Sequence, residues 1–169
     1  SAKFSEAWGL DVPSNPGFRL DQMMSGLHDG RIKALYLIGE NPVQTEPNAH
    51  HVEEGMEKLD FVVAQDLFLN DSNRKYANVN FPASSFAEKD GTFTNTERRV
   101  NRVRRAVPCP GNAREDFRIV VEMAEALGAN WPAYESAEDA WDEFADLAPL
   151  WSGIRYDRIE EVGLQWPCT

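Results

Sequence analysis

The sequence predicts an α/β fold: an open, mainly parallel, Rossmann-like sheet flanked by helices, with a small hairpin and C-terminal helices. Two apolar runs, residues 32–38 and 61–64, have the near-continuous pattern of buried strands in a parallel sheet. Between them, apolar residues from Ala49 to Leu59 recur at helical spacing. Strand, helix and strand within about 30 residues make a βαβ unit, which gives parallel neighbouring strands.

Other elements of the first half follow from local patterns. Residues 1–18 contain turn-forming Gly, Pro and Asn and predict a lead-in loop. Apolar residues at helical spacing over 20–27, followed by Asp29-Gly30, predict a helix that ends there. Residues 70–77 predict a short helix, and 79–81 a third short strand closed by a proline. The helix that starts near residue 49 has two candidate caps, Thr45 and Asn48.

The second half predicts a hairpin or edge strand within 99–107 and then helices. Asn112 and Glu115 have capping-box spacing, and Gly128 is a stop for the helix between. The predicted apolar face of that helix is Phe117, Val120, Met123, Ala124 and Leu127. Ser136 caps another helix, and residues 156–163 predict a last helical turn. The whole chain, 1–169, is predicted to be one α/β domain, with a lead-in (1–18), a βαβ core (19–107) and a helical part (108–169).

Composition excludes several classes of function. The chain has 169 residues, 42% apolar and 27% charged, with a net charge of −11. That charge disfavours binding to nucleic acids and anionic membranes, which are polyanions. No apolar run approaches the roughly 20 residues of a membrane span, so no direct membrane insertion is expected. Five arginines between 98 and 105 are the local exception, either as a solvated strand face or as a contact for phosphate or carboxylate.

The sequence predicts neither catalytic nor metal-ligating residues. Cys109 and Cys168 lie far apart, without metal-ligand spacing or a disulfide framework, and are interpreted as free thiols in a reducing compartment. His50 and His51 are adjacent, so on a helix they point about 100° apart and cannot chelate one ion together. Walker and G-x-G-x-x-G loops are missing.

Polar residues follow each predicted strand, where open α/β sheets bind ligands. Gly39-Glu40-Asn41 follows the first strand, Gln65-Asp66 the second, and Ser84-Ser85 with 88–95 the third. Gly39 is either a tight turn or a place where backbone N–H groups face an anion. Asp66 is either an acceptor for a planar amidine edge such as that of guanine, or an N-cap for a helix from residue 67 onward. The polar run 86–100 offers Thr and Asn side chains to phosphate or sugar, unless it is a plain turn before an edge hairpin.

Four motifs carry a resemblance to a known family. They are LIGENP (37–42), QDLFL (65–69), FPASSFAEKDGTFTNTERRV (81–100) and GLQWPC (163–168). Together they resemble the molybdopterin oxidoreductase family and, more narrowly, the catalytic alpha subunit of formate dehydrogenases. Asn70-Asp71-Ser72 departs from the family's usual Thr-rich turn, and Asn78-Val79-Asn80 from its usual Ala-Asp-Val-Val.

The resemblance implies that this chain is one dinucleotide-binding domain of a much longer polypeptide. It implies a molybdopterin guanine dinucleotide carrying Mo or W, with iron–sulfur clusters and the metal-ligating residue elsewhere in the parent. The implied cofactor contacts are Gly39, Glu40, Asn41, Gln65, Asp66, Gly91, Thr92, Asn95 and Arg98. Implied partners are the remaining domains of the catalytic subunit and electron-transfer subunits.

The parent is expected to oxidise formate to carbon dioxide in the cytoplasm, or in the periplasm, while the piece alone is inactive. Alternatives are a stand-alone, non-catalytic binding module of the same fold, and the same family acting on another substrate such as nitrate.

Overall fold

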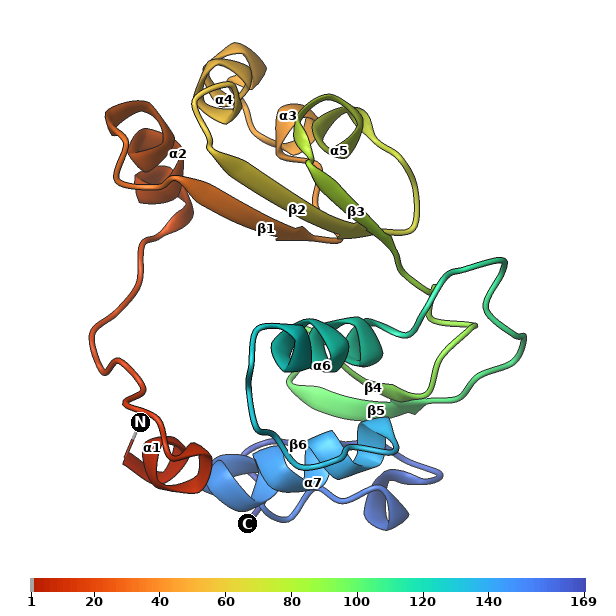
Figure 1. The fold of residues 1–169 in the computed structure, drawn as a ribbon. Coiled ribbons are helices and arrows are strands. Elements are labelled where there is room, and N and C mark those ends of the chain that lie inside the picture. Colours follow the sequence, from red (N-terminus) through yellow and green to blue (C-terminus); the bar gives the residue numbers. More distant parts are fainter. Residues whose placement is uncertain (1) are drawn as a thin grey trace. The chain divides into compact units, whose positions relative to one another are not determined.

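The computed structural model describes residues 2–169, which form two compact units (Figure 1). The sheet unit comprises Asn15–Ser84 and Gly111–Asp116. The hairpin unit comprises the segment up to Ser14 together with Ser85–Pro110 and Phe117–Thr169. The predicted single-domain organisation over 1–169 stays a prediction.

The sheet unit is built on three parallel strands in the order β1-β2-β3. They are β1 (Ala34–Ile38), β2 (Phe61–Asp66) and β3 (Val79–Pro82). Ile38 of β1 lies opposite Gln65 of β2, which in turn lies opposite Phe81 of β3. The predicted parallel sheet is therefore confirmed, and β2 runs two residues further than the predicted 61–64.

Four helices belong to the sheet unit, and the sequence signals explain where two of them begin or end. They are α2 (Leu20–Asp29), α3 (Pro42–Thr45), α4 (Ala49–Met56) and α5 (Asp71–Tyr76). Helix α2 ends at Gly30, whose φ of 76° is left-handed and suits glycine. Asn48 caps α4 by accepting the N–H of His51 over 3.1 Å, which decides between the two predicted caps.

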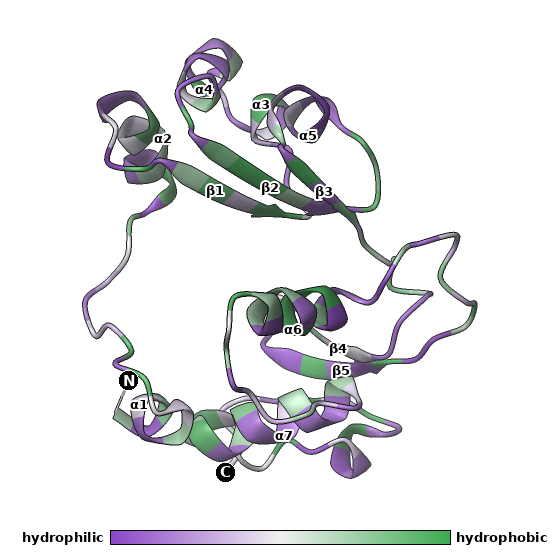
Figure 2. Ribbon diagram, viewed as in Figure 1, coloured by the Kyte–Doolittle hydropathy of each residue, from purple (hydrophilic) through white to green (hydrophobic). Residues whose placement is uncertain are grey.

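The core of the sheet unit lies between the sheet and its helices, which cover one face (Figure 1). Its buried residues are Leu27, Val52, Met56 and Val62. In Figure 2 the strands are predominantly hydrophobic, while the helices carry hydrophilic outer faces. The expectation that the first strand is buried on both faces is wrong, since β1 has no fully buried residue and Ile38 is 48% exposed.

Residues 111–116 return to the edge of β3. The N–H of Arg114 donates to the carbonyl of Pro82 over 3.0 Å, and Ser84 donates to the carbonyl of Arg114 over 2.9 Å. These bonds form a parallel bridge between Ala83 and Arg114. The predicted capping box at Asn112 and Glu115 is wrong, because this backbone pairs with the sheet and helix α6 starts only at Asp116.

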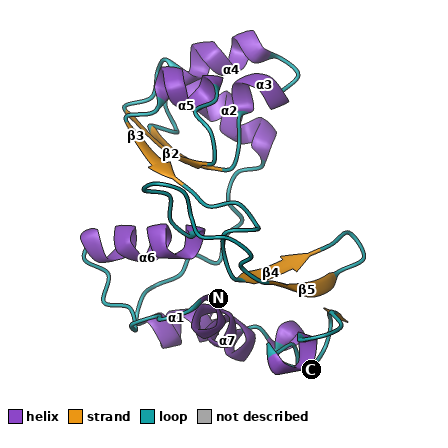
Figure 3. Cartoon of the chain, turned by 90° about the vertical axis from the view of Figure 1, so that its right-hand side faces the viewer, coloured by secondary structure: helices purple, strands orange, loops and turns teal. Residues whose placement is uncertain are grey.

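The hairpin unit contains a second, antiparallel sheet in the order β4-β5-β6 (Figure 3). Its strands are β4 (Gly91–Thr94), β5 (Arg99–Val103) and β6 (Leu164–Gln165). The predicted hairpin is confirmed, with Thr92 opposite Arg102.

In the described part of the chain, the hairpin unit also contains three α-helices and two short 3₁₀ helices. They are α1 (Ala2–Trp8), α6 (Asp116–Ala126), α7 (Ala137–Leu147), η1 (Pro149–Trp151) and η2 (Asp157–Ile159). The lead-in predicted as a loop is thus helical over its first part. The first residue of α6, Asp116, belongs to the sheet unit. No helix within residues 2–169 has the length and apolar character needed to cross a membrane.

Helix ends in the hairpin unit follow the predicted signals more closely than helix faces do. Ser136 and Asp139 form a reciprocal capping box at the start of α7. Gly128, with φ 88°, stops the chain after α6 as predicted. The predicted apolar face of α6 is right only in part. Phe117, Val120, Met123 and Ala124 are half-buried, but the fully buried residue is Ile119, and Leu127 lies past the helix end and is 81% exposed.

Aromatic side chains dominate the core of the hairpin unit. Val100, Ile154, Tyr156 and Ile159 are buried. Partly buried rings pack along them in a chain from Trp141 through Phe144 and Trp151 to Trp166, with neighbouring centroids 5.5, 5.4 and 4.8 Å apart. The indole N–H of Trp141 donates to the carbonyl of Ile154 over 2.7 Å.

Candidate functional site

The carboxyl end of β1 turns sharply at Gly39. Its φ of 63° is left-handed, and a side-chain carbon placed there would meet no atom within 4 Å, so the space beside this backbone is open. The N–H of Gly39 donates to the carbonyl of Gln65 over 2.8 Å. Gly39 thus forms the tight turn that was one of its two predicted roles, and its own N–H is used by the sheet; the other predicted role, in which backbone N–H groups here face an anion, stays a prediction.

The next two backbone N–H groups, those of Glu40 and Asn41, have no hydrogen-bond acceptor within residues 2–169. They follow β1 at the edge where the strands end, beside the open space at Gly39. Adjacent N–H groups at such a position form a concave donor set suited to phosphate oxygens. These two N–H groups are therefore the backbone donors that this turn has available for the predicted anion, and the anion site itself stays a prediction.

The side chain of Asn41 ties the strand-end loop to α5. Its Oδ1 accepts the hydroxyl of Ser72 over 2.6 Å, and its Nδ2 donates to Gln44 over 3.1 Å. Ser72 is fully buried and donates its hydroxyl to Asn41 while accepting the N–H of Val43 over 3.1 Å. Asn41 therefore holds the loop in place through its side chain, leaving its N–H for a ligand. The side chain of Glu40 is exposed.

Gln65 is a buried connector, with 1% of its surface exposed. Its Oε1 accepts the hydroxyl of Tyr36, and its Nε2 donates to Asp116 Oδ1 over 2.7 Å. Burial raises the pKa of Tyr36, and the nearby Asp116 carboxylate adds to this, so the phenol keeps the proton that it donates. The amide of Gln65 is thus engaged within the sheet unit, although the sequence assigned it to an open strand-end loop.

Asp66 organises the loop that follows β2. Its Oδ1 accepts the N–H groups of Leu67 and Phe68 over 2.6 and 3.5 Å, and its Oδ2 accepts Nδ2 of Asn70 over 2.8 Å. The alternative prediction of a helix beginning at residue 67 is wrong, because α5 begins at Asp71 and Asn70 is its N-cap. One acceptor position on Oδ2 remains available, since a carboxylate oxygen accepts two bonds.

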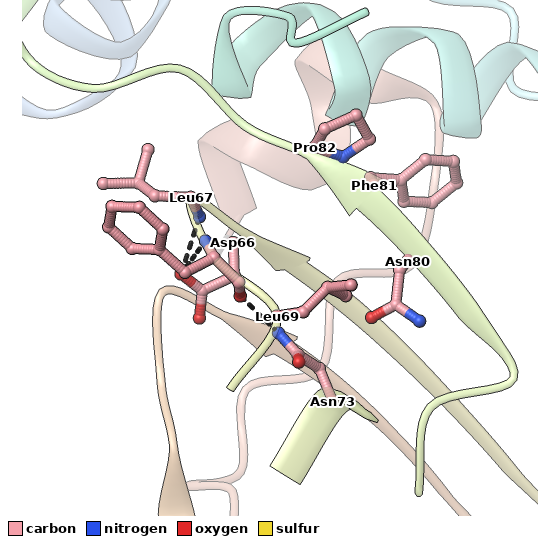
Figure 4. Close-up of a pocket in the computed structure, with 8 residues that line it drawn as sticks. Asp66, Leu67, Leu69, Asn73, Asn80, Phe81 and Pro82 are labelled. Carbon is pink, nitrogen blue, oxygen red and sulfur yellow. Dashed lines mark hydrogen bonds between the residues drawn. The ribbon is translucent and has the colours of Figure 1, made fainter. Parts of the chain in front are cut away.

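A hollow of ≈ 230 Å³ lies beside this loop (Figure 4). The end of β2, the residues that follow it, β3 and one side chain of α5 line it. The lining residues are Asp66, Leu67, Phe68, Leu69, Asn73, Asn80, Phe81 and Pro82. Sequence reasoning singled out Asp66 alone among them as a site residue. It noted the Asn-rich departures at 70–72 and 78–80 but assigned no side chain there to a site.

The four remaining predicted contacts, Gly91, Thr92, Asn95 and Arg98, lie in the hairpin unit. Asn95 Oδ1 accepts the N–H groups of Glu97 and Arg99 over 3.1 and 2.9 Å, which fixes the turn of the β4–β5 hairpin. Arg98 has φ 67°, the one left-handed non-glycine residue within 2–169. Gly91 opens β4, and Thr92 faces Arg102 across the hairpin. A single crevice formed by both groups of contacts stays a prediction.

The turn at Arg98 is braced by the C-terminal segment. The guanidinium lies over the ring of Trp166, 5.2 Å from its centroid, and the N–H of Trp166 donates to the carbonyl of Arg98 over 3.1 Å. Arg99 pairs with Glu97 over 2.9 Å, and this contact holds the pKa of Glu97 below its usual value. Much of the predicted arginine cluster is therefore engaged within the hairpin unit.

Within residues 2–169 no group of three or more His, Cys, Asp or Glu side chains is arranged to hold a metal ion. Cys109 and Cys168 are free thiols, as predicted.

Comparison with known proteins identifies the family. Residues 2–126 match the molybdopterin oxidoreductase family. The chain belongs to that family. Family membership implies a molybdopterin cofactor with a metal, and the strand-end donors of the sheet unit are of the chemical type that its phosphates require.

Relatives of this molybdopterin oxidoreductase chain are alpha subunits. The chain is 44% identical to "F420-dependent formate dehydrogenase subunit alpha" of Methanocaldococcus jannaschii, over 98% of this chain and 24% of that protein. It is 39% identical to "F420-dependent formate dehydrogenase 1 subunit alpha" of Methanococcus maripaludis, again over 98% and 24%. The chain therefore spans about a quarter of the length of these relatives.

A solved structure supports the fold. The chain superposes on acetylene hydratase from Pelobacter acetylenicus with a TM-score of 0.70, covering 99% of this chain and 24% of that one. The identity is 15%, so this likeness concerns the fold alone. It agrees with the α/β architecture predicted from the sequence.

Proposed function

We propose that this chain is the part of a formate dehydrogenase catalytic subunit that holds one molybdopterin guanine dinucleotide. The observation that carries the proposal is the end of β1, where the N–H groups of Glu40 and Asn41 have no acceptor within residues 2–169 and Gly39 leaves the space beside them open. Such N–H groups donate to phosphate oxygens without adding charge. The alpha-subunit relatives, matched over 98% of this chain, supply the substrate class.

Each predicted contact has a role that its environment supports. Glu40 and Asn41 donate backbone N–H groups to the pyrophosphate. Asp66 Oδ2, with one acceptor position left, receives an N–H of the guanine edge. Gln65 positions this edge of the sheet from within, through Tyr36 and Asp116. Gly91, Thr92, Asn95 and Arg98, which lie in the hairpin unit, stay predicted contacts of the cofactor.

When bound, the molybdopterin guanine dinucleotide with its Mo or W would supply the redox chemistry for the two-electron oxidation of formate to carbon dioxide and a proton. Residues of this chain bind and orient the dinucleotide, and none of them breaks a bond. Iron–sulfur clusters in the parent, electron-transfer subunits and a cytoplasmic location complete the proposal.

GDP tests the binding step, because it carries both the pyrophosphate and the guanine. Isothermal titration of the chain with GDP is expected to show one-site binding. Gly39→Ala should weaken it at least tenfold, since the new methyl group occupies the open space beside the donors. Gly30→Ala is the matched control: φ is 76° there, no atom lies within 4 Å, and the position is remote from the strand ends.

Absence of GDP binding by a folded chain would refute the proposed nucleotide site. An equal loss of GDP affinity in Gly39→Ala and Gly30→Ala would show that backbone strain, and not the blocked space at Gly39, weakens binding. The substrate requires the full-length subunit. That protein should reduce an artificial electron-acceptor dye only when formate is present. If it instead oxidises a reduced dye when nitrate is present, the same domain belongs to a member of the family that acts on nitrate.

A further inference from the structure

The hollow beside the 67–69 loop has a buried acceptor that no described group satisfies. Asn73 is 2% exposed and lines the hollow from α5. Its Nδ2 donates to the carbonyl of Phe68 over 2.9 Å, which fixes the orientation of the amide, because the reverse orientation would bring two oxygens together. Its Oδ1 has no hydrogen-bond partner within residues 2–169. Buried acceptors in proteins nearly always have a donor, so we expect a bound molecule to supply one here.

The proposed contact between Asp66 and guanine leaves one donor of the base without a partner. The edge of guanine that faces the carboxylate carries two neighbouring donors, N1–H and the exocyclic amine. The Asp66 carboxylate already accepts two N–H groups on Oδ1 and one on Oδ2, so a single acceptor position is left. The second donor of the base needs another acceptor, because a buried donor without a partner weakens binding.

We propose that Asn73 Oδ1 is this second acceptor and makes the site selective for guanine. The inference rests on the proposed function, because it concerns the same base at the same carboxylate. N1–H, the more acidic of the two donors, bonds to the charged Oδ2 of Asp66, and the exocyclic amine bonds to the neutral Oδ1 of Asn73. Both residues line the hollow, Asp66 from the end of β2 and Asn73 from α5 (Figure 4). Asn73 lies outside the four motifs that carry the resemblance to the family.

Apolar side chains of the hollow suit the faces of a purine. Leu67, Leu69 and Phe81 line it together with the polar residues. Leu67 and Leu69 are 47 and 58% exposed, so these side chains can move aside to admit the base to the buried Oδ1 without opening the core. They then pack on the base, as apolar side chains do in other base-binding pockets. The apolar cover excludes water, which strengthens the hydrogen bonds beneath it.

GDP and inosine diphosphate (IDP) differ only in the exocyclic amine and therefore test this contact directly. In isothermal titration the chain should bind GDP about tenfold more tightly than IDP, which is the effect of one hydrogen bond to a buried acceptor. Asn73→Ala should reduce the affinity for GDP to that for IDP and leave the affinity for IDP unchanged. Glu54→Gln, on the exposed side of α4, is the control and should keep the preference for GDP.

Asn73→Asp separates the acceptor from the bond to Phe68. The aspartate keeps an oxygen toward the hollow but cannot donate to the carbonyl of Phe68. It should therefore keep the preference for GDP over IDP, whatever its effect on the affinity that the two nucleotides share. Loss of the preference in Asn73→Asp as well as in Asn73→Ala would assign the effect to the position of the 67–69 loop and overturn the proposal.

The remaining outcomes distinguish this inference from the proposed function. Equal binding of GDP and IDP by the unmodified chain would overturn the Asn73 contact and leave the nucleotide site standing. Absence of binding of either nucleotide by a folded chain would refute the nucleotide site and this inference with it. An equal loss of affinity for both nucleotides in Asn73→Ala would show that Asn73 acts on a part of the nucleotide other than the amine, and would also overturn the proposal.

Discussion

The amide nitrogen of Gln65, on β2, donates to the carboxylate of Asp116 over 2.7 Å, across 51 positions of sequence. The same glutamine accepts the hydroxyl of Tyr36 on β1. A residue that sequence reasoning placed in an open ligand loop therefore connects two strands and the segment that returns to them. This engagement makes Gln65 a determinant of stability in its own right.

Replacing Gln65 by Met should destabilise the chain by about 1–3 kcal/mol. The volume is kept, but the Tyr36 hydroxyl loses its buried hydrogen-bond partner, which costs about that much for an unsatisfied group. Urea denaturation followed by circular dichroism measures the loss. Glu54→Gln serves as the control, and a Gln65→Met midpoint equal to that control would mean that solvent replaces the glutamine.

Gly55→Ala should destabilise the sheet unit, although alanine favours helices. The added Cβ would lie 2.8 Å from Leu27 Cβ, so α2 and α4 would have to separate. Overpacking of this kind costs about 1–3 kcal/mol, against about 1 kcal/mol gained in helix propensity. A thermal melt should show a lower Tm. His50→Ala, on the exposed side of the same helix, should not lower it, and a raised Tm for Gly55→Ala would contradict the close packing.

Replacing Arg98 by glycine should destabilise the chain less than replacing it by alanine. Both substitutions remove the cation–π contact with Trp166, worth about 0.5–1 kcal/mol at an exposed site. Glycine also removes the strain of the left-handed backbone, about 1–2 kcal/mol for other residues, whereas alanine keeps it. Arg98→Gly should therefore be more stable than Arg98→Ala by about 1 kcal/mol in urea denaturation. Equal stabilities would show that this turn relaxes out of the left-handed region.

Stability should fall in alkali because of Tyr134. Burial, together with its hydrogen bond to Glu143, raises the pKa of Tyr134 to about 12, whereas an unfolded tyrosine ionises near pH 10. The folded state thus binds the proton more tightly, so the stabilisation is complete below pH 10 and is lost as the pH rises to about 12. Tyr134→Phe should flatten the dependence of Tm on pH across this interval. Glu143→Gln should lower the pKa seen in the absorbance of tyrosinate at alkaline pH, and an unchanged titration would rule out the contact.

The sequence predicted the elements of the sheet unit well, because periodicity and caps are local. The parallel strands, the Asn48 cap and the stop at Gly30 all follow from neighbouring residues. The wrong predictions share one physical cause, which is hydrogen bonding between residues that are far apart in the sequence. The carbonyl of Gln65 takes the N–H of Gly39, and the carbonyl of Pro82 takes the N–H of Arg114, so backbone groups that looked available are used. Neither pairing has a signature within a short window.

The candidate site was predicted in part for the same reason. Gly39, Glu40 and Asn41 could be proposed as site residues because polar residues directly after an apolar run are a local signal. Asn73 was not found, since its importance depends on burial beneath a loop from another part of the chain. Asp66 was found, but its bonds to Leu67, Phe68 and Asn70 became evident only in three dimensions.

The return of residues 111–116 to β3 has a consequence for biosynthesis. A ribosome makes β1, β2 and β3 well before Arg114 and Asp116 leave the exit tunnel. Until then the edge of β3 lacks its last partner and the amide of Gln65 has no carboxylate. The sheet of the nascent chain cannot be completed until residues 85–110, which separate the two parts of the sheet unit, have been synthesised. Its last contacts join residues that are far apart in sequence and therefore form late. A stalled chain ending before residue 111 would be a natural target for chaperones.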